Sequence, residues 1–203
     1  MALNLGVLVS GNGTNLQAIL DAVASGELDA RVRCVVSNKR EAFALERARK
    51  AGVPAIALAH KEYATREAFD EAVLAALREH GVEWVVLAGF MRVLTPGFLR
   101  SFAGRVVNVH PALLPAFPGV NAVAQALAHG VRVSGCTVHF VDEGVDSGPI
   151  IAQRAVPVLD GDDEASLAAR IHAAEHELFV AVLADIAAGR VAPAASPAGG
   201  GSA

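Results

Sequence analysis

The sequence predicts one α/β domain in which a mostly parallel sheet carries helices on both faces. Short apolar runs of strand length alternate along the chain with longer segments of helical periodicity, as in sheets joined by crossover helices. The 203 residues suffice for one domain with a sizeable core, but not for two ordinary domains and a linker. Hydrophobic residues make up 53% of the chain and aromatic residues 5%, which suits alanine-rich helices between strands. We therefore expect a single Rossmann-like domain.

In the first half of the chain, four apolar runs alternate with helical patterns. The expected strands are residues 5–9, 32–36, 53–58 and 82–87. The third contains Pro54, which cannot donate to a sheet ladder and favours an early or edge position. The first two helices are expected to end at Gly26 and Gly52, and Thr65 is the expected N-cap of the third.

The second half continues with strands at residues 105–109, 135–141 and 150–158. The last two are joined by a short loop, which favours an antiparallel hairpin towards the C-terminus, and the first of the two has alternating character. Thr95-Pro96 predicts a helix start, because proline is favoured at the first helical position. Asn121 is expected to cap a short helix that ends at Gly130, and acidic residues 162–164 suit the start of the last helix.

Composition limits the domain and its partners. Residues 191–203 are rich in Ala, Pro, Gly and Ser, so we expect a domain at 1–190 and a disordered tail at 191–203. A net charge of −4 gives no broad footprint for nucleic acid or an anionic membrane. The opening segment is far too short for a membrane span. Cys34 and Cys136 lack metal-ligand spacing and are expected to be buried free thiols, which favours a cytoplasmic location.

Asn108 and His110 form the first chemistry-bearing pair. They end an apolar run, and residues two apart in a strand point to the same face. Pro111 should end the strand and leave both side chains at its carboxyl end, where open α/β sheets place their ligands. A turn-forming asparagine or a half-buried histidine is the ordinary explanation of either residue alone. Together they favour a site.

The segment Gly11-Asn-Gly-Thr-Asn15 lies between a strand and a helix. Its main-chain N–H groups and the helix dipole suit an anion, and a phosphate is the natural ligand. The third glycine of the dinucleotide fingerprint would fall at Leu16, and no Gly-Lys-Ser/Thr follows, so a monophosphate is favoured over a dinucleotide or ATP. A tight turn that needs only glycine geometry remains the alternative.

Asp146 lies between Gly144 and Gly148, where a turn-forming aspartate is the ordinary explanation. If this loop returns to the carboxyl edge of the central strand, the carboxylate orients His110 and favours its protonated form. The three side chains then suit acyl transfer, with Asn108 and His110 as donors that would not need to move. No nucleophile elbow exists, so direct attack by a substrate amine fits better than covalent catalysis. A metal site from His110, His139 and Asp146 matches no closed ligand motif, and no metal is expected.

Three segments carry a resemblance to a known family. They are Ser10-Gly-Asn-Gly-Thr-Asn-Leu-Gln17, Asn108-Val-His-Pro-Ala-Leu-Leu-Pro-Ala-Phe-Pro-Gly119 and Asp142-Glu-Gly-Val-Asp-Ser-Gly-Pro149. They closely resemble the phosphoribosylglycinamide formyltransferase family, folate-dependent enzymes of purine biosynthesis. The Asn, His and Asp set is shared with methionyl-tRNA formyltransferase and formyltetrahydrofolate deformylase. The Gly-Asn-Gly-Thr-Asn opening and the lack of an extra domain favour the glycinamide enzymes.

The resemblance implies formyl transfer from 10-formyltetrahydrofolate to the amine of glycinamide ribonucleotide, with no metal. It implies catalytic roles for Asn108, His110 and Asp146. It places the ribonucleotide phosphate on Gly13, Thr14 and Asn15, and the ribose hydroxyls on Glu175. It places the pterin on Met91, Arg92, Val93 and Leu94 with Val141 and the rest of the loop to residue 146, and the benzoyl-glutamate part near Arg66. For Glu175 and Arg66, the ordinary alternatives are a solvated helix face and a first-turn helix residue.

The resemblance also implies a cis peptide bond at Leu114-Pro115. One departure is the segment Asn121-Ala-Val-Ala, which lacks the histidines that the family often carries there, so no role of theirs is transferred. Two other functions remain open: a hydrolase that releases formate from the same folate, and a non-catalytic nucleotide- or folate-binding module. The expected partners are small-molecule substrates only, with the chain as a monomer or homodimer.

Overall fold

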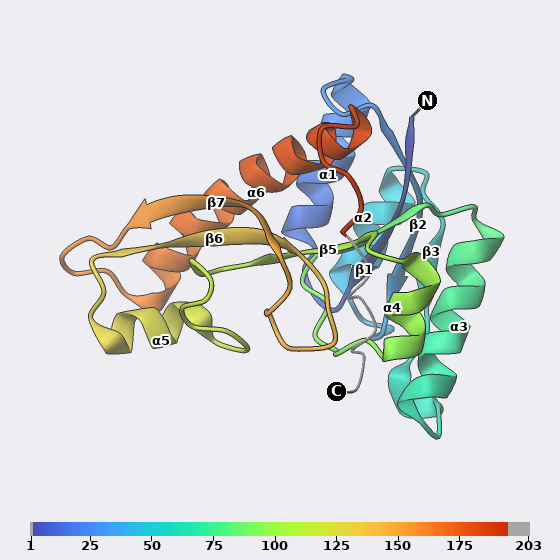
Figure 1. Ribbon diagram of the computed structural model, residues 1–203, viewed down its shortest axis with the longest axis horizontal. Helices are drawn as coiled ribbons and strands as arrows, with labels where there is room; N and C mark the ends of the chain where they lie inside the picture. Colours follow the sequence, from blue (N-terminus) through green and yellow to red (C-terminus); the bar gives the residue numbers. More distant parts are fainter. Residues whose placement is uncertain (1, 195–203) are drawn as a thin grey trace, which may run out of the picture.

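The computed structural model describes residues 2–194, and in this part of the chain seven strands form one sheet, in the order β3-β2-β1-β4-β5-β6-β7 (Figure 1). The strands are β1 (Leu3–Val9), β2 (Ala30–Ser37), β3 (Ala55–Ala57), β4 (Trp84–Leu87), β5 (Val106–His110), β6 (Val133–Phe140) and β7 (Ile150–Pro157). Neighbouring strands from β3 to β5 are parallel, whereas β6 is antiparallel to both β5 and β7. The predicted fold class is confirmed, including the C-terminal hairpin and the edge position of the strand that follows Pro54.

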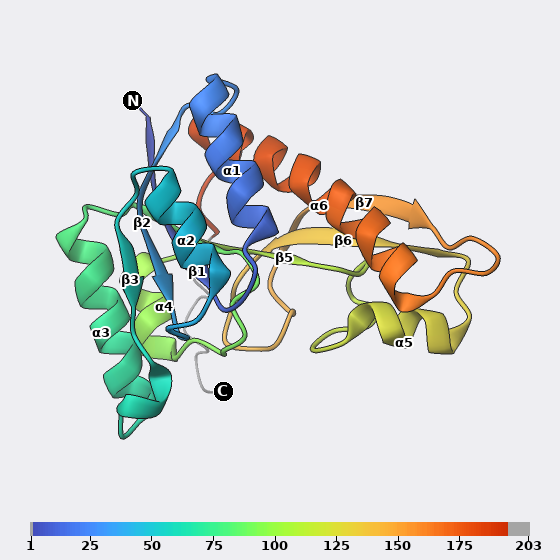
Figure 2. The ribbon, with the colours of Figure 1, turned by 180° about the vertical axis from the view of Figure 1, so that it is seen from behind.

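Helices cover both faces of this sheet. They are α1 (Thr14–Ser25), α2 (Phe43–Lys50), α3 (Arg66–Glu79), α4 (Pro96–Phe102), α5 (Ala122–His129) and α6 (Glu164–Ala187), with a short 3₁₀ turn η1 (His60–Glu62). Apolar residues of α1, α2 and α6 pack into one buried cluster, and those of α3 and α4 pack into a second cluster on the other face. Figure 2 shows α1, α2 and α6 side by side. The two clusters leave the carboxyl edge of the parallel strands free for a site.

Most predicted helix ends are confirmed. The Thr65 hydroxyl accepts the N–H of Ala68 at 3.1 Å, and the Thr95 hydroxyl accepts the N–H of Phe98 at 3.3 Å. Asn121 is the N-cap residue of α5, as predicted, but among the described residues its side chain makes no capping hydrogen bond to this helix. Asn121 instead adopts a left-handed backbone with φ of 59°, a conformation that asparagine tolerates better than most residues.

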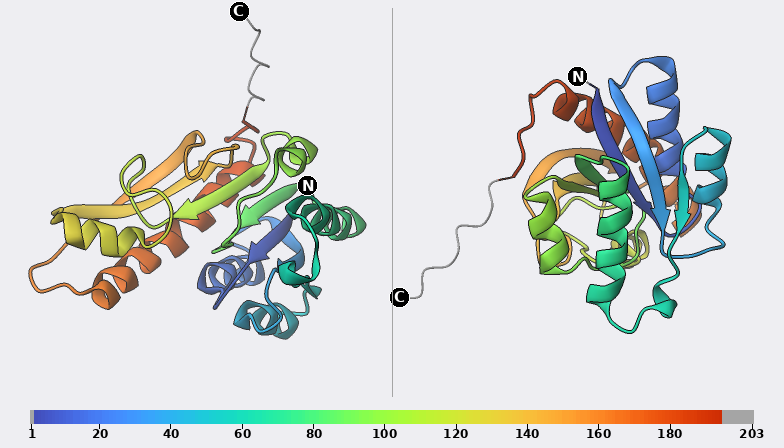
Figure 3. Two further views of the ribbon diagram at one scale, coloured as in Figure 1. Left: turned by 90° about the horizontal axis from the view of Figure 1, so that it is seen from below. Right: turned by 90° about the vertical axis from the view of Figure 1, so that its right-hand side faces the viewer.

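The alternating character expected for β6 is also wrong, because the strand is buried from Ser134 to Phe140 on both faces. Cys136 and Val138 belong to the cluster that includes α6, and Figure 3 shows α6 running along β6 and β7. On the opposite face, the Thr137 hydroxyl donates to the carbonyl of Ala112 at 2.7 Å and accepts the N–H of Leu114 at 3.0 Å. The proline-rich segment after β5 therefore covers a face that the sequence pattern assigns to solvent.

This proline-rich segment contains the predicted cis peptide bond at Leu114-Pro115, which is confirmed. At the other end, Val191 and Ala194 pack against the core, and the N–H of Ala194 donates to the carbonyl of Gly104 at 3.0 Å. The chain thus keeps contact with the domain for four residues beyond the expected boundary. The remainder of the expected tail, 195–203, lies outside the described residues. Among residues 2–194, no helix combines the length and apolar character of a bilayer span.

Candidate active site

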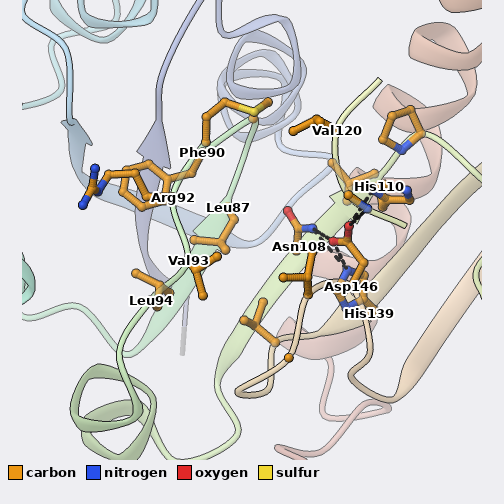
Figure 4. A pocket seen from close by; sticks show the side chains of 18 of the residues that line it. Leu87, Phe90, Arg92, Val93, Leu94, Asn108, His110, Val120, His139 and Asp146 are labelled. Carbon is orange, nitrogen blue, oxygen red and sulfur yellow. Dashed lines mark hydrogen bonds and ion pairs between the residues drawn. The ribbon is translucent and has the colours of Figure 1, made fainter. Parts of the chain in front are cut away.

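Asn108, His110 and Asp146 come together at the carboxyl end of β5 (Figure 4). Asn108 and His110 point to one face because they are two residues apart in the strand, and Pro111 follows directly. β6 returns antiparallel to β5, so that His139 lies opposite Asn108 in the register. The loop after β6 then carries Asp146 back to the same edge, where it adopts a left-handed backbone with φ of 51°. The predicted juxtaposition of these three residues is confirmed.

Asp146 is the acceptor that joins the cluster. Its Oδ2 accepts the N–H of Gly119 at 2.8 Å and faces His110 Nδ1 at 3.2 Å. Its Oδ1 accepts the Asn108 amide at 3.4 Å and lies 3.6 Å from His139 Nε2. The Asp146 side chain is 13% exposed, so the donors from Gly119, His110 and Asn108 replace most of the water that a carboxylate requires. One carboxylate therefore holds groups from β5 and from the segment after β5.

Both ring nitrogens of His110 face oxygen atoms. Nδ1 faces the carboxylate of Asp146, and Nε2 lies 2.8 Å from the carbonyl oxygen of Phe117. Carbonyl and carboxylate oxygens only accept hydrogen bonds, so both contacts are satisfied when each ring nitrogen carries a proton. The geometry thus favours the imidazolium form, whose positive charge lies against Asp146.

Asn108 points its amide nitrogen at the protein and its oxygen away from Asp146 (Figure 4). Besides the bond to Asp146, the amide nitrogen lies 3.1 Å from His139 Nε2, which accepts when His139 Nδ1 donates to the carbonyl of Phe140 at 2.8 Å. Both amide hydrogens then have partners. The expectation of donors already free for a substrate oxygen is therefore wrong, because in a half-buried cluster each donor finds an acceptor within the protein.

The surroundings of Asp146 keep its carboxylate ionised. Burial by itself raises the pKa of Asp146, but the adjacent His139 ring, the N–H of Gly119 and the charge of His110 outweigh burial. The net result is a pKa below the ordinary value of 3.8. A negatively charged acceptor at this position suits the two donors that face it, His110 Nδ1 and the Asn108 amide.

A cavity of about 410 Å³ opens beside this cluster, between the segment after β4 and the loop after β6. Its lining includes most of the residues expected to hold a pterin, namely Met91, Arg92, Val93, Leu94, Val141 and the loop to residue 146 except Glu143, together with Asn108 and His110. The volume lies in the range of small-molecule sites. Among residues 2–194, no hydrogen bond engages the main-chain N–H groups of Arg92, Val93 and Leu94. The cavity thus combines apolar walls with main-chain groups that are available to a polar heterocycle.

Arg66 does not line this cavity. It is the exposed first residue of α3, whose Phe69 ring lies 5.2 Å from the Arg92 guanidinium carbon. Its predicted place near the outer end of a bound folate stays a prediction.

The Gly-rich loop lies at the carboxyl end of β1, the neighbour of β4. Gly13 precedes α1 with a left-handed φ of 76°, and no hydrogen bond within residues 2–194 engages the N–H groups of Gly13, Thr14 or Asn15. The loop is tied to the cavity wall, because the Ser10 N–H donates to the carbonyl of Gly89 at 3.1 Å. Free N–H groups at the start of a 12-residue helix form an anion-accepting site.

Glu175 of α6 reaches this loop. Its Oε2 accepts the Asn15 amide at 3.2 Å and contacts His172 Nδ1 at 2.8 Å. The Glu175 side chain is only 3% exposed, so the ordinary alternative of a solvated helix face is wrong. The long helix α6 crosses α1 and brings this carboxylate beside the Gly-rich loop, a contact between residues 160 positions apart that periodicity alone does not give.

Two groups of the site do not stand out in the sequence. The sequence suggests His139 only as a metal ligand without a matching motif, although an antiparallel register of β6 against β5 places it opposite Asn108. The N–H of Gly119 carries no sequence signal, because any residue supplies that group. Within the described part of the chain, no group of three His, Cys, Asp or Glu side chains is arranged to hold a metal ion.

Comparison with known proteins places the site in a family context. Residues 3–183 match the formyl transferase family. The phosphoribosylglycinamide formyltransferase of Mycobacterium tuberculosis is 52% identical over 181 residues, which are 89% of this chain and 83% of that protein. The solved structure of glycinamide ribonucleotide transformylase 1 from Symbiobacterium toebii has a TM-score of 0.92 and 50% identity, and the match covers 94% of this chain and 90% of that one.

A longer relative matches as well. The trifunctional purine biosynthetic protein adenosine-3 of Drosophila pseudoobscura pseudoobscura is 50% identical over 185 residues. These residues are 90% of this chain but 14% of that protein, so the chain spans only a small part of this relative.

Proposed function

Because this chain belongs to the formyl transferase family, we propose that it transfers the formyl group of 10-formyltetrahydrofolate to the amine of glycinamide ribonucleotide. The products are formylglycinamide ribonucleotide and tetrahydrofolate, a step of de novo purine biosynthesis. One observation carries the proposal: Asp146 holds Asn108 and His110 at the wall of an apolar cavity. Amide and imidazolium donors beside such a cavity suit a carbonyl oxygen that becomes negative during acyl transfer.

The ribonucleotide fits the Gly-rich loop. The free N–H groups of Gly13, Thr14 and Asn15 suit a monophosphate, and the buried carboxylate of Glu175 beside them suits ribose hydroxyl donors. Since Ser10 links this loop to the cavity wall, a ligand that spans both regions can bring its amine to the Asn108 cluster.

The reduced folate fits the cavity. Exposed apolar side chains such as Met91, Val93 and Val145 suit the faces of a flat ring, and the free main-chain groups of residues 92–94 suit its polar edge. Bound there, the folate supplies a formyl group on a nitrogen that can leave. Arg66, the exposed first residue of α3, is the cation that we assign to its outer, acidic part.

In the proposed reaction, a new C–N bond forms between the substrate amine and the formyl carbon, and the bond from that carbon to the folate nitrogen breaks. Asn108 and protonated His110 each exchange one acceptor within the protein for the formyl oxygen while that oxygen carries negative charge. Asp146 keeps His110 protonated and, through an ordered water, helps to move the proton from the attacking amine to the departing nitrogen. Donors that strengthen their bonds as charge develops lower the barrier.

Formyl transfer is tested by mixing the purified protein with 10-formyl-5,8-dideazafolate and glycinamide ribonucleotide and following the absorbance change. We expect turnover that requires both substrates. Release of formate without the ribonucleotide would favour the hydrolase alternative, and ligand binding without turnover would favour the binding module. We further propose a cytoplasmic location, which two buried free thiols support. We also propose small-molecule substrates only and a monomer or homodimer, whose oligomeric state size-exclusion chromatography measures.

A further inference from the structure

Arg47 of α2 directs its whole guanidinium group at the Gly-rich loop. Nε donates to the carbonyl oxygen of Asn12 at 2.8 Å, and Nη2 donates to the Asn12 side-chain oxygen at 2.8 Å. Nη1 donates to the side-chain oxygen of Gln17 at 3.1 Å. Asn12 immediately precedes the three residues assigned to the phosphate, and Gln17 follows them on α1, so Arg47 clamps both ends of the anion-accepting segment.

The loop needs such support. Its free N–H groups present partial positive charges side by side, and Gly13 holds a left-handed backbone with φ of 76°. The helix that carries Arg47 lies directly against it, because a Cβ atom on Gly13 would come within 2.6 Å of the Ala44 Cβ. The main chains are also joined, since the N–H of Ala44 donates to the carbonyl of Gly11 at 3.1 Å.

The guanidinium group is itself held in place. Its central carbon lies 4.9 Å from the centre of the Phe43 ring, a cation–π contact on the same helix. Phe43 is 49% exposed, so burial in the core does not explain why an aromatic residue lies here. Its contact with the Arg47 guanidinium group does explain it. A lysine at residue 47 would keep the charge but lose the planar fork that reaches both oxygens of Asn12 at once.

We propose that Arg47 is a positioning residue for monophosphate recognition, and this inference rests on the function proposed above. It fixes the Asn12 peptide, and with it the N–H groups of Gly13, Thr14 and Asn15, in the conformation that accepts the ribonucleotide phosphate. Arg47 acts through the loop, since its three guanidinium nitrogens all donate to the protein. Its positive charge behind the loop adds to the attraction for the phosphate.

The test compares Arg47→Lys and Arg47→Gln with wild type in steady-state kinetics against both substrates. We expect KM for the ribonucleotide to rise roughly tenfold in Arg47→Lys, which corresponds to about 1.4 kcal/mol of binding free energy. The rise should be larger in Arg47→Gln. KM for the folate, and kcat when both substrates are saturating, should stay at wild-type values. Arg47→Ala should regain ribonucleotide affinity when millimolar guanidinium chloride is added, which a loss of folding would not show.

Arg49→Gln is the matched control, because Arg49 lies on the same helix, pairs with exposed Glu46 and donates to no loop atom. It should leave both KM values unchanged. If the Arg47 variants do not fold, Asn12→Ala removes one acceptor from the loop side and should raise the same KM. The proposal is overturned if Arg47→Lys matches wild type, if both KM values rise equally, or if only the melting temperature falls.

Failure of the proposed function has a different signature. In that case wild type itself shows no ribonucleotide-dependent turnover. Binding of inorganic phosphate, measured by calorimetry on wild type and Arg47→Gln, still decides whether Arg47 supports the loop. Equal phosphate affinity in the two proteins would overturn the inference whatever the reaction is.

Discussion

Asp146→Asn keeps the shape of the side chain while it removes the charge and one acceptor oxygen. Both oxygens of Asp146 face donors, since Oδ2 meets the N–H of Gly119 and His110 Nδ1, and Oδ1 meets the Asn108 amide. An amide NH₂ group at either position must therefore face another donor. The less disruptive orientation keeps the oxygen towards Gly119 and His110 and loses the bond to Asn108.

The magnitude follows from what His110 and Asn108 lose. Without the adjacent negative charge, the doubly protonated ring of His110 loses its counter-ion, and the Asn108 amide loses the oxygen that orients it. Loss of one donor to a developing oxyanion costs roughly 10²–10³ in kcat, about 3–4 kcal/mol. Because the substitution weakens both donors, we expect a loss at the upper end of this range. Affinity for the ribonucleotide should change little, because the phosphate site lies on a different loop.

The assay is the steady-state formyl transfer rate, measured beside calorimetric binding of the ribonucleotide. Asp160→Asn is the matched control, because Asp160 pairs with Arg132 on the exposed surface, with side chains 93% and 79% exposed. The control should keep wild-type kcat. A folded Asp146→Asn protein with near-wild-type kcat would refute the reasoning, since it would show that neither the charge of Asp146 nor its contacts with three donors matter for the reaction.

Three further outcomes are expected. Gly13→Val should raise KM for the ribonucleotide far more than KM for the folate, because its Cβ would lie 2.6 Å from the Ala44 Cβ; equal rises would contradict the phosphate placement. His110→Ala should remove most turnover and leave ribonucleotide binding intact, and retained kcat would move the site elsewhere. The hydrogen bond to Glu175 raises the pKa of His172 above its ordinary 6.5, although burial opposes it. Stability from this pair is therefore complete below the ordinary pKa and lost as pH rises through the raised value. In urea unfolding at acidic pH, His172→Gln should lower the free energy of unfolding by less than about 1 kcal/mol, because the ring is half exposed. Near pH 9 it should leave the free energy of unfolding unchanged.

Local rules explain why much of the fold and the core of the site follow from the sequence. Proline at residue 111 ends β5, and the period of two places Asn108 and His110 on one face. The short connection between the last two strands gives an antiparallel pair. β6 ends opposite Val107, near the amino end of β5, so the loop that follows folds back along the sheet to bring Asp146 to Asn108 and His110. Each step involves residues that are neighbours in the chain or in adjacent strands.

The remaining features depend on contacts that no local pattern carries. Burial of Glu175 depends on how α6 crosses α1, and the continuous burial of β6 depends on a proline-rich segment that folds over it. The carbonyl of Phe117 reaches His110 through a turn with a left-handed φ of 53° at a phenylalanine, a residue type that rarely adopts this conformation. Such contacts are set by the tertiary packing of whole elements, so they emerge only with the structure.

His110 already donates a hydrogen bond within the protein, and this bond affects how the site can favour a transition state over a substrate. In this structure, His110 Nε2 donates to the neutral carbonyl of Phe117 at 2.8 Å. A neutral formyl oxygen gains little by competing for that proton, since it is the same kind of acceptor. An oxyanion gains more, because hydrogen bonds to charged acceptors are about twice as strong as neutral ones. Under the proposed function, the exchange thus favours the charged state selectively, which lowers the barrier without tightening substrate binding. This is the physical reason to expect that loss of His110 lowers kcat and leaves KM for either substrate largely unchanged.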